Sequence, residues 1–205
     1  MIKRQNGIIV QHDPNNPFYG DGGDSSRSTG VMATFGSAED QEIITKHYVG
    51  NGLIVRNPFQ KQWTYTQDVS RDQTTPMISG LATNPENRPI IKQILFATLK
   101  RLGFAQNGDL LNPAIIGQMI LGAGIWQLYW FLPISYLFHI LDLYYNCLCD
   151  PWSEQNQIMC SSKQLGTASL YKTIHPNWKD AVDLYWSHYP FRDQKEIAEQ
   201  IKKNF

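Results

Sequence analysis

The spacing of apolar and polar residues predicts several helices. From residue 90 to residue 102, apolar side chains recur every three or four positions, and Gly103 follows them as a stop signal. A second helix is predicted to begin after Ser70, because Ser70 and Gln73 have the spacing of a capping box and apolar residues follow. A third is predicted over residues 37–48, again from a start that resembles a capping box.

The most apolar part of the chain runs from residue 114 to residue 141 and has no formally charged side chain when His139 is neutral. A run of this length raises the alternative of a transmembrane span. Two glycines and the central Pro133 divide it into shorter segments, and acidic rather than basic residues come after it. We therefore expect two buried helices that form a hairpin, at about residues 114–127 and 133–149, and no contact with a membrane.

Two short runs of β-branched residues, at residues 6–11 and 51–56, each begin with an Asn-Gly turn signal. We expect these runs to pair with each other as a small two-stranded β element near the N-terminus. The predicted fold class is thus mainly α, with α-helical hairpins and this small sheet, in one domain over residues 1–205. Residues 190–205 would form a tail that docks on the body or on a partner.

Composition narrows the function classes. The chain carries 18 basic and 18 acidic residues, so no global electrostatic field attracts nucleic acid, and no nucleic-acid partner is expected. Three cysteines cannot all pair within the chain, which agrees with a reducing compartment. The first apolar run is too short for the apolar region of a secretory signal, so we expect none.

Two polar clusters carry the candidate chemistry. The first covers residues 21–30, where glycines let side chains on both sides of a turn converge. The second covers residues 70–73 at the start of the predicted helix. The central question is whether these two clusters meet in the folded chain.

Asp24 and Asp72 are the best acid and base pair among these residues, because hydrolysis of a glycosidic bond needs two carboxyl groups with different pKa values. Arg27 and Arg71 would keep one carboxyl group ionised or bind an anionic substrate. In the alternative interpretation, the two aspartates cap helices and the arginines bridge them for structural reasons only.

Aromatic residues close to these clusters are candidates for substrate contact. Trp63, Tyr65 and Trp152 fall in predicted loops, where their rings would stack on sugar rings. The denser aromatic group at residues 126–136 is more typical of a buried core. Neither a metal nor another cofactor is expected, because the histidines and cysteines lack the spacing of a zinc site and the N-terminal aspartates do not match a calcium-binding EF-hand loop.

Three stretches together resemble motifs of a family of uncharacterised bacteriophage and prophage proteins. They are Gly20-Asp21-Gly22-Gly23-Asp24-Ser25 with Arg27, then Ser70-Arg71-Asp72-Gln73, and then Asn107-Gly108-Asp109. The resemblance implies a shortened relative of the α/α toroid found in many polysaccharide hydrolases and lyases, whose inner helices carry active-site residues at their starts.

The resemblance also implies two functions. In the first, the protein is a phage-encoded polysaccharide hydrolase or lyase with a cleft for a glycan. In the alternative, it is a non-enzymatic tail or capsid accessory whose partners are other virion proteins. Either function would place it in the virion, or in the host cytoplasm during assembly.

Overall fold

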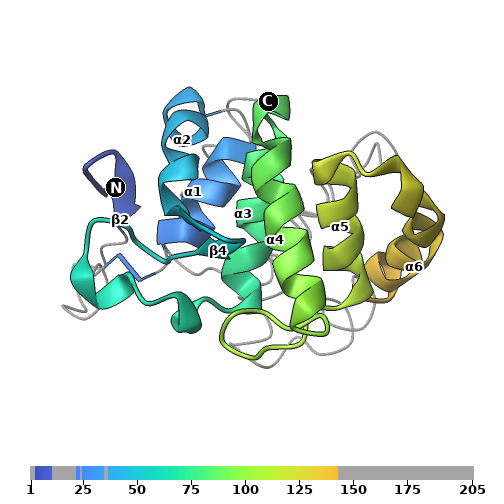
Figure 1. Ribbon diagram of the computed structural model, residues 1–205. Coiled ribbons are helices and arrows are strands. Elements are labelled where there is room, and N and C mark those ends of the chain that lie inside the picture. Colours follow the sequence, from blue (N-terminus) through green and yellow to red (C-terminus); the bar gives the residue numbers. More distant parts are fainter. Residues whose placement is uncertain (1–2, 11–21, 24, 35–36, 143–205) are drawn as a thin grey trace.

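A computed structural model of the protein describes residues 3–10, 22–23, 25–34 and 37–142 (Figure 1). The described part of the chain is mainly helical, which confirms that element of the predicted fold class. Its α-helices are α1 (Ser25–Thr34), α2 (Ala38–Ile43), α3 (Arg71–Ala82), α4 (Arg88–Lys100), α5 (Pro113–Ala123) and α6 (Leu132–Asp142). Its 3₁₀ helices are η1 (Ile44–His47), η2 (Lys61–Trp63), η3 (Thr66–Asp68), η4 (Pro85–Asn87) and η5 (Trp126–Phe131).

The small two-stranded sheet near the N-terminus is present, but its pairing differs from the prediction. β1 (Lys3–Gln5) pairs with β2 (Ile8–Val10), and β3 (Tyr48–Gly50) pairs with β4 (Leu53–Ile54) in a separate sheet. The expectation that residues 6–11 pair with residues 51–56 is therefore wrong. Each Asn-Gly pair is instead the turn of its own hairpin, where both residues adopt positive φ angles that suit a tight two-residue turn.

Local signals place most of the helix ends. Ser70 and Gln73 form the predicted capping box at the start of α3. Asn112 caps α5, and Gly124, with φ 66°, ends it in the left-handed conformation. The helix predicted over residues 37–48 is shorter than expected, because α2 passes into η1 and the chain then enters β3.

The apolar run folds as two helices, α5 and α6, joined by η5. The hydroxyl of Ser135 near the start of α6 lies 3.3 Å from the carbonyl oxygen of Ala114 near the start of α5. The two helices therefore meet at their starts, and the expected hairpin, in which the start of α6 would lie beside the end of α5, is wrong. Within the described residues, no helix combines the length and the apolar character needed to cross a membrane. α5 is largely buried, but α6 leaves most of its apolar residues exposed, and so does the aromatic η5. The expectation that residues 133–149 are buried is wrong for Ile134, Leu137, Phe138 and Leu141, and residues 143–149 lie outside the described part of the chain. The expectation that the aromatic group at 126–136 belongs to the core is wrong for Trp126, Tyr129 and Trp130.

α1, α3 and α5 run in the same direction. Gln73 near the start of α3 bonds to Gly23 just before α1, and Gly30 in the middle of α1 faces Pro76 in the middle of α3. Gln118 of α5 donates a hydrogen bond of 2.5 Å to the hydroxyl of Ser79 in α3. In each pair of helices, residues near the start of one helix contact residues near the start of the other, and later residues contact later residues. All three helices therefore begin at the same end of the molecule.

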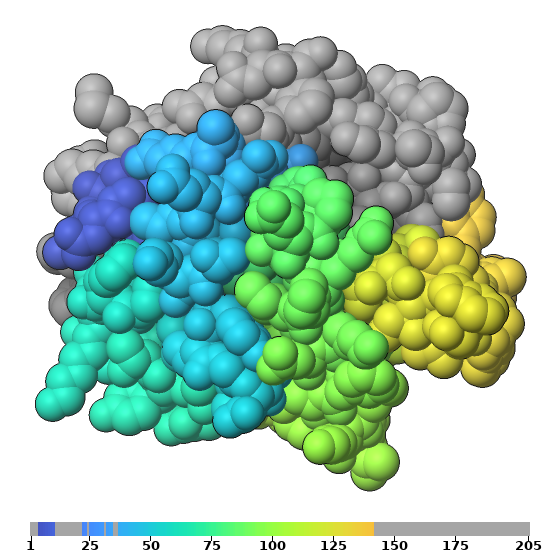
Figure 2. All heavy atoms as spheres, turned by 45° about the horizontal axis from the view of Figure 1, so that its top comes forward, coloured from blue at the N-terminus to red at the C-terminus, as the bar shows by residue number. Residues whose placement is uncertain are grey.

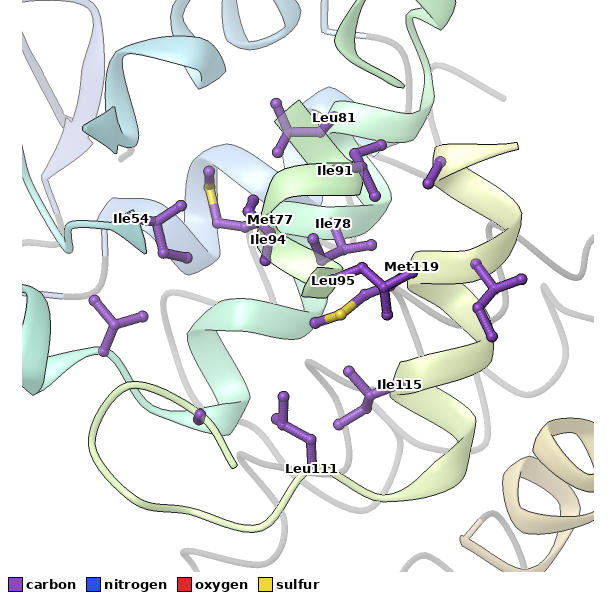
Figure 3. Packing of buried hydrophobic residues seen from close by; sticks show 14 of the residues in the cluster. Ile54, Met77, Ile78, Leu81, Ile91, Ile94, Leu95, Leu111, Ile115 and Met119 are labelled. Carbon is purple, nitrogen blue, oxygen red and sulfur yellow. The ribbon is translucent and has the colours of Figure 1, made fainter. Parts of the chain in front are cut away.

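The hydrophobic core lies between α3, α4 and α5, with additions from β4 and the loop before α5. Figure 1 shows α4 in front of α3, with α5 beside them. Figure 3 shows how side chains from these elements meet, and the labelled members are Ile54, Met77, Ile78, Leu81, Ile91, Ile94, Leu95, Leu111, Ile115 and Met119. Burial of each large side chain contributes about 1.5–3 kcal/mol, so this cluster fixes the orientation of α3.

Candidate functional site

The first polar cluster forms the start of α1. The backbone amide and the hydroxyl of Ser25 both donate to the carbonyl oxygen of Gly22, at 3.1 and 2.6 Å. Gly22 has a φ of +79°, and a Cβ there would lie 2.8 Å from a side-chain oxygen of Gln60. A glycine is therefore required by both the backbone conformation and the available space. Asn57 holds this turn from the other side through a 3.2 Å bond to the Ser25 hydroxyl.

The second polar cluster forms the start of α3, where its side chains bond to one another. The amide of Ser70 donates to the side-chain oxygen of Gln73 at 3.1 Å, and the hydroxyl of Ser70 donates to one carboxylate oxygen of Asp72. The amide group of Gln73 then donates 3.1 Å to the carbonyl oxygen of Gly23. One residue of the capping box thus also binds the first cluster.

Arg27 and Asp72 join the two clusters directly. A guanidinium nitrogen of Arg27 lies 3.4 Å from a carboxylate oxygen of Asp72, although the residues are 45 positions apart in the chain. Only 7% of the Arg27 side chain is exposed, compared with 18% of the Asp72 side chain. The arginine is therefore buried behind the carboxylate, and Asp72 is the member of the pair that solvent or a ligand reaches.

The Asn-Gly-Asp stretch before α5 meets the same end of α3. A carboxylate oxygen of Asp109 accepts a 3.3 Å hydrogen bond from the backbone amide of Arg71, the first residue of α3. The backbone amide of Asn107 donates to the carbonyl oxygen of Val69 at 3.1 Å. An acidic group at this position stabilises the positive end of the helix dipole. The described residues of all three stretches that carry the family resemblance thus lie around the start of α3.

Close packing between α1 and α3 holds the two clusters together. A Cβ at Gly30 would lie 2.5 Å from the carbonyl oxygen of Pro76 and 2.7 Å from the amide nitrogen of Met77. A Cβ at Gly80 would lie 2.8 Å from the carbonyl oxygen of Gly30. The two backbones therefore touch without an intervening side chain, and any larger residue at Gly30 must push them apart.

α1 is unusually polar for a buried helix. The hydroxyl groups of Ser26, Ser28 and Thr29 are buried and, among the residues that the structure describes, have no hydrogen-bond partner. Burial of a hydroxyl group without a partner costs stability. The composition of α1 therefore has no explanation in core packing alone.

The loop after β4 brings aromatic residues to the first cluster. The carbonyl oxygen of Arg56 accepts a 3.0 Å bond from the amide of Ser26, so this loop is attached to α1. The guanidinium of Arg56 lies 5.4 Å from the ring centre of Trp63, a distance that allows a cation–π contact. Tyr65, two residues further on, is exposed.

The structure brings together three of the predicted site residues, Arg27, Arg71 and Asp72, at the junction of α1 and α3. Trp63 and Tyr65 both lie on the loop that is attached to α1. Asp24 and Trp152 are outside the described residues. Of the two carboxyl groups proposed as acid and base, the structure therefore describes only that of Asp72.

Sequence patterns missed two residues that build the site. Asn57 is buried and binds both the Ser25 hydroxyl and the amide of Phe59, but it lies in an irregular stretch without a periodic signal. Asp109 belongs to one of the three stretches that carry the resemblance, but its contact with α3 depends on tertiary structure.

η1 contains a buried histidine, His47. The ring nitrogen Nδ1 of His47 is 3.1 Å from the carbonyl oxygen of Val55, and burial lowers the pKa of His47 to about 4. The described residues contain no group of three or more histidine, cysteine, aspartate or glutamate side chains that would hold a metal ion.

The arrangement offers the partly exposed carboxylate of Asp72, held in position by a hydroxyl group and a buried guanidinium, with aromatic residues on a neighbouring loop. Such a group is able to accept a proton or bind a hydroxyl group of a ligand. Comparisons with protein-family models, with curated proteins and with solved structures give no match to this chain.

Proposed function

We propose that the protein is a phage-encoded polysaccharide hydrolase or lyase, with Asp72 as the base and Asp24 as the acid. The observation that carries this proposal is the contact between Arg27 and Asp72, which joins two polar clusters far apart in the sequence. Both clusters lie at the starts of parallel helices. A site at this position agrees with the inner-helix starts of the α/α toroid.

The surroundings of Asp72 suit a base. Its two carboxylate oxygens are bonded to different groups, the hydroxyl of Ser70 and the guanidinium of Arg27, so the carboxylate is held in one orientation. Fixed orientation of a reacting group contributes strongly to catalysis. Because Arg27 is buried, its role here is to position Asp72 rather than to bind substrate. Arg71 and the loop aromatics Trp63 and Tyr65 would then contact the sugar.

The helix arrangement supports the toroid part of the proposal. α1, α3 and α5 are parallel, and α3 contacts both of the others. α4 is antiparallel to α5, because Gly122 near the end of α5 lies beside Ile91 near the start of α4. Alternation of parallel inner helices with reversed outer helices is the pattern expected of a toroid, here with few hairpins.

The test uses the full chain and a panel of bacterial surface polysaccharides. Release of reducing ends reports hydrolysis, and absorbance of unsaturated sugar products reports a lyase. Asp72→Asn is expected to lower the rate by about 100-fold or more, because acid–base groups typically contribute factors of this size. Asp68→Asn, which changes a nearby partly exposed aspartate of η3, serves as the control and is expected to keep the rate. Equal rates for Asp72→Asn and wild type would remove Asp72 from catalysis.

The alternative function is a non-enzymatic virion component, and one observation favours it. Trp126 and Trp130 of η5 are both exposed, and exposed tryptophans are common at protein–protein contacts. This function predicts that the protein co-purifies with phage particles and that Trp130→Ala weakens that association. It also predicts that none of the polysaccharides is cleaved.

A further inference from the structure

α4 is followed by a leucine in a backbone conformation that leucine rarely adopts. Leu102 has a φ of 55°, in the left-handed region. Its amide donates to the carbonyl oxygen of Leu99 at 2.9 Å, and the amide of Gly103 donates to that of Thr98 at 3.0 Å. In this arrangement, the Schellman motif, glycine usually takes the position that Leu102 occupies. The two other described non-glycine residues with a positive φ are both asparagines, which adopt it more readily.

Burial does not explain this leucine either. The Leu102 side chain is 84% exposed, more than any other large apolar side chain of the described residues. A side chain that remains in water gains almost none of the free energy of apolar burial. The stability of the fold therefore gives no reason for a leucine here, and departures of this kind from a local rule are typical of functional positions.

Other exposed apolar side chains lie beside Leu102. The chain turns back after it, because Phe104 and Leu110 form an antiparallel bridge and the amide of Leu111 donates to the carbonyl oxygen of Gly103 at 2.9 Å. Figure 1 shows this loop below α4, and in Figure 2 the lime-green residues after α4 protrude at the lower edge of the molecule. The exposed members of this cluster, here called the apolar tip, are Leu99, Leu102, Phe104 and Leu110.

Basic side chains along α4 lead to the apolar tip. Lys92 and Lys100 are exposed and lie four positions before and after Phe96, and the amino group of Lys92 is 5.9 Å from the ring centre of Phe96. Arg88 begins the helix, and Arg101 follows its last residue. No carboxylate of the described residues forms an ion pair with any of these four cations. The sequence has no acidic residue from position 87 to position 108, so this positive charge is uncompensated locally although the whole chain is neutral.

We propose that the apolar tip and the basic residues of α4 bind the surface of a lipid bilayer that contains anionic lipids. The leucines would enter the boundary between headgroups and acyl chains, and the lysine and arginine side chains would stay at the level of the lipid phosphates. The expectation of no membrane contact was drawn from residues 114–141, and this surface lies outside them. Binding of this kind requires no helix to cross the bilayer.

The combination of leucines and cations favours lipid over other anionic partners. A nucleic acid or an acidic polysaccharide would pair with the cations and leave the leucines in water. An acidic protein would need a pocket for a side chain as prominent as Leu102, whereas fluid lipid closes around it. A bilayer with anionic lipids uses both parts of the surface at once.

The loop that carries the apolar tip also contacts the start of α3. The amide of Asn107 donates to the carbonyl oxygen of Val69, and a carboxylate oxygen of Asp109 accepts from the amide of Arg71. A protein bound through the apolar tip would therefore hold the junction of α1 and α3 close to the bilayer.

The first test measures binding of the full chain to lipid vesicles by flotation. Wild type is expected to bind vesicles of equal parts phosphatidylcholine and phosphatidylglycerol at least about tenfold more strongly than vesicles of phosphatidylcholine alone, because each basic side chain near an anionic surface adds to binding. Binding to neither kind of vesicle would overturn the proposal and leave an acidic protein as the partner. Equal binding to both kinds would also overturn it.

Leu102→Asn tests the apolar tip in the same assay. It is expected to bind the mixed vesicles about tenfold more weakly than wild type. It is also expected to fold, because asparagine suits the left-handed conformation at this position. Leu137→Asn is the matched control, since Leu137 of α6 is 56% exposed, and it is expected to bind as wild type does. Unchanged binding of Leu102→Asn, or an equal loss in Leu137→Asn, would overturn the proposal.

The second test locates the contact by hydrogen exchange of the full chain with and without the mixed vesicles. Peptides that cover residues 99–111 are expected to exchange several-fold more slowly on the vesicles, because bound lipid limits access of water to their amides. Peptides that cover residues 126–141, which include the exposed apolar residues of η5 and α6, are expected to exchange at the same rate in both samples. Slower exchange at residues 126–141 with no change at residues 99–111 would overturn the proposal.

Discussion

Replacement of Gly30 by alanine tests how the site is held together. The new Cβ would lie 2.5 Å from the carbonyl oxygen of Pro76 and 2.7 Å from the amide nitrogen of Met77. Normal contact distances are about 3.5–4.0 Å, so α1 and α3 must separate by about 1 Å. Both obstructing atoms are backbone atoms inside a helix, and neither is able to rotate away.

The expected free-energy change is the difference between two effects. Overpacking against an immobile neighbour costs about 1–3 kcal/mol or more, whereas alanine gains about 1 kcal/mol over glycine in a helix. Because the overlap at Gly30 is with backbone, we expect the upper part of the cost and a net loss of about 2 kcal/mol. For a chain of this length, that loss lowers the melting temperature by about 4–8 °C.

Gly122→Ala is the matched control for this measurement. Its Cβ would meet side-chain methyl groups of Ile91 and Ala82 at 3.1 and 3.2 Å, and the Ile91 side chain has room to adjust. The gain in helix propensity is then expected to offset the crowding, and the net change to stay within about 0.5 kcal/mol. Both variants are compared by urea unfolding followed by circular dichroism. A Gly30→Ala protein as stable as Gly122→Ala would refute the close approach of α1 and α3.

Two further predictions concern buried polar groups. Burial lowers the pKa of His47 to about 4 from its ordinary 6.5. The folded protein therefore keeps its full stability above pH 6.5, where His47 is neutral in both the folded and the unfolded chain. As the pH falls from 6.5 toward 4, the free energy of unfolding is expected to drop by about 3 kcal/mol. Urea unfolding at several pH values should show this loss in wild type and a smaller one in His47→Gln, and parallel pH profiles would contradict the assignment. Ser26→Ala removes a buried hydroxyl without a partner among the described residues, so it is expected to leave the free energy of unfolding unchanged or raise it by up to about 1 kcal/mol. A loss above about 1 kcal/mol in the same assay would mean that this hydroxyl is bonded.

Local sequence signals predicted where helices start better than they predicted which strands pair. The start of α3 follows from Ser70 and Gln73, whose bonds are made within one turn of helix. The Asn-Gly pairs correctly signalled turns, but the choice of strand partner was wrong, because the short hairpins close over neighbouring residues. Pairing residues that follow each other costs less loop entropy than joining distant strands.

The orientation of the two apolar helices α5 and α6 could not be predicted from the sequence. α5 and α6 are both rich in apolar residues, yet only α5 is largely buried, and Ser135 and His139 take the inner positions of α6. Periodicity identifies the faces of a helix and does not say which face meets the core. In the same way, Gly30 gave no local sign of its contact with Pro76, since that contact exists only in the folded chain.

The sequence indicates some of the residues at the junction of α1 and α3, and their role in a site stays a prediction. Arg27 and Asp72 are candidates because of their residue types within compact polar clusters, and the structure brings them to 3.4 Å from each other. The sequence did not indicate that Arg27 would be buried and directed at Asp72 rather than at a ligand. That distinction depends on burial, which only the packing of α1 against α3 determines.

A double-mutant cycle on Arg27 and Asp72 tests most directly the claim that the two polar clusters form one site. The free energy of unfolding is measured for wild type, Arg27→Gln, Asp72→Asn and the double variant. Because the pair is largely buried, we expect the two single variants together to lose more unfolding free energy than the double variant loses. The difference, which is the coupling energy of the pair, is expected to be about 1–3 kcal/mol. Losses that add within about 0.3–0.5 kcal/mol, as they do for distant positions, would show that the clusters do not meet.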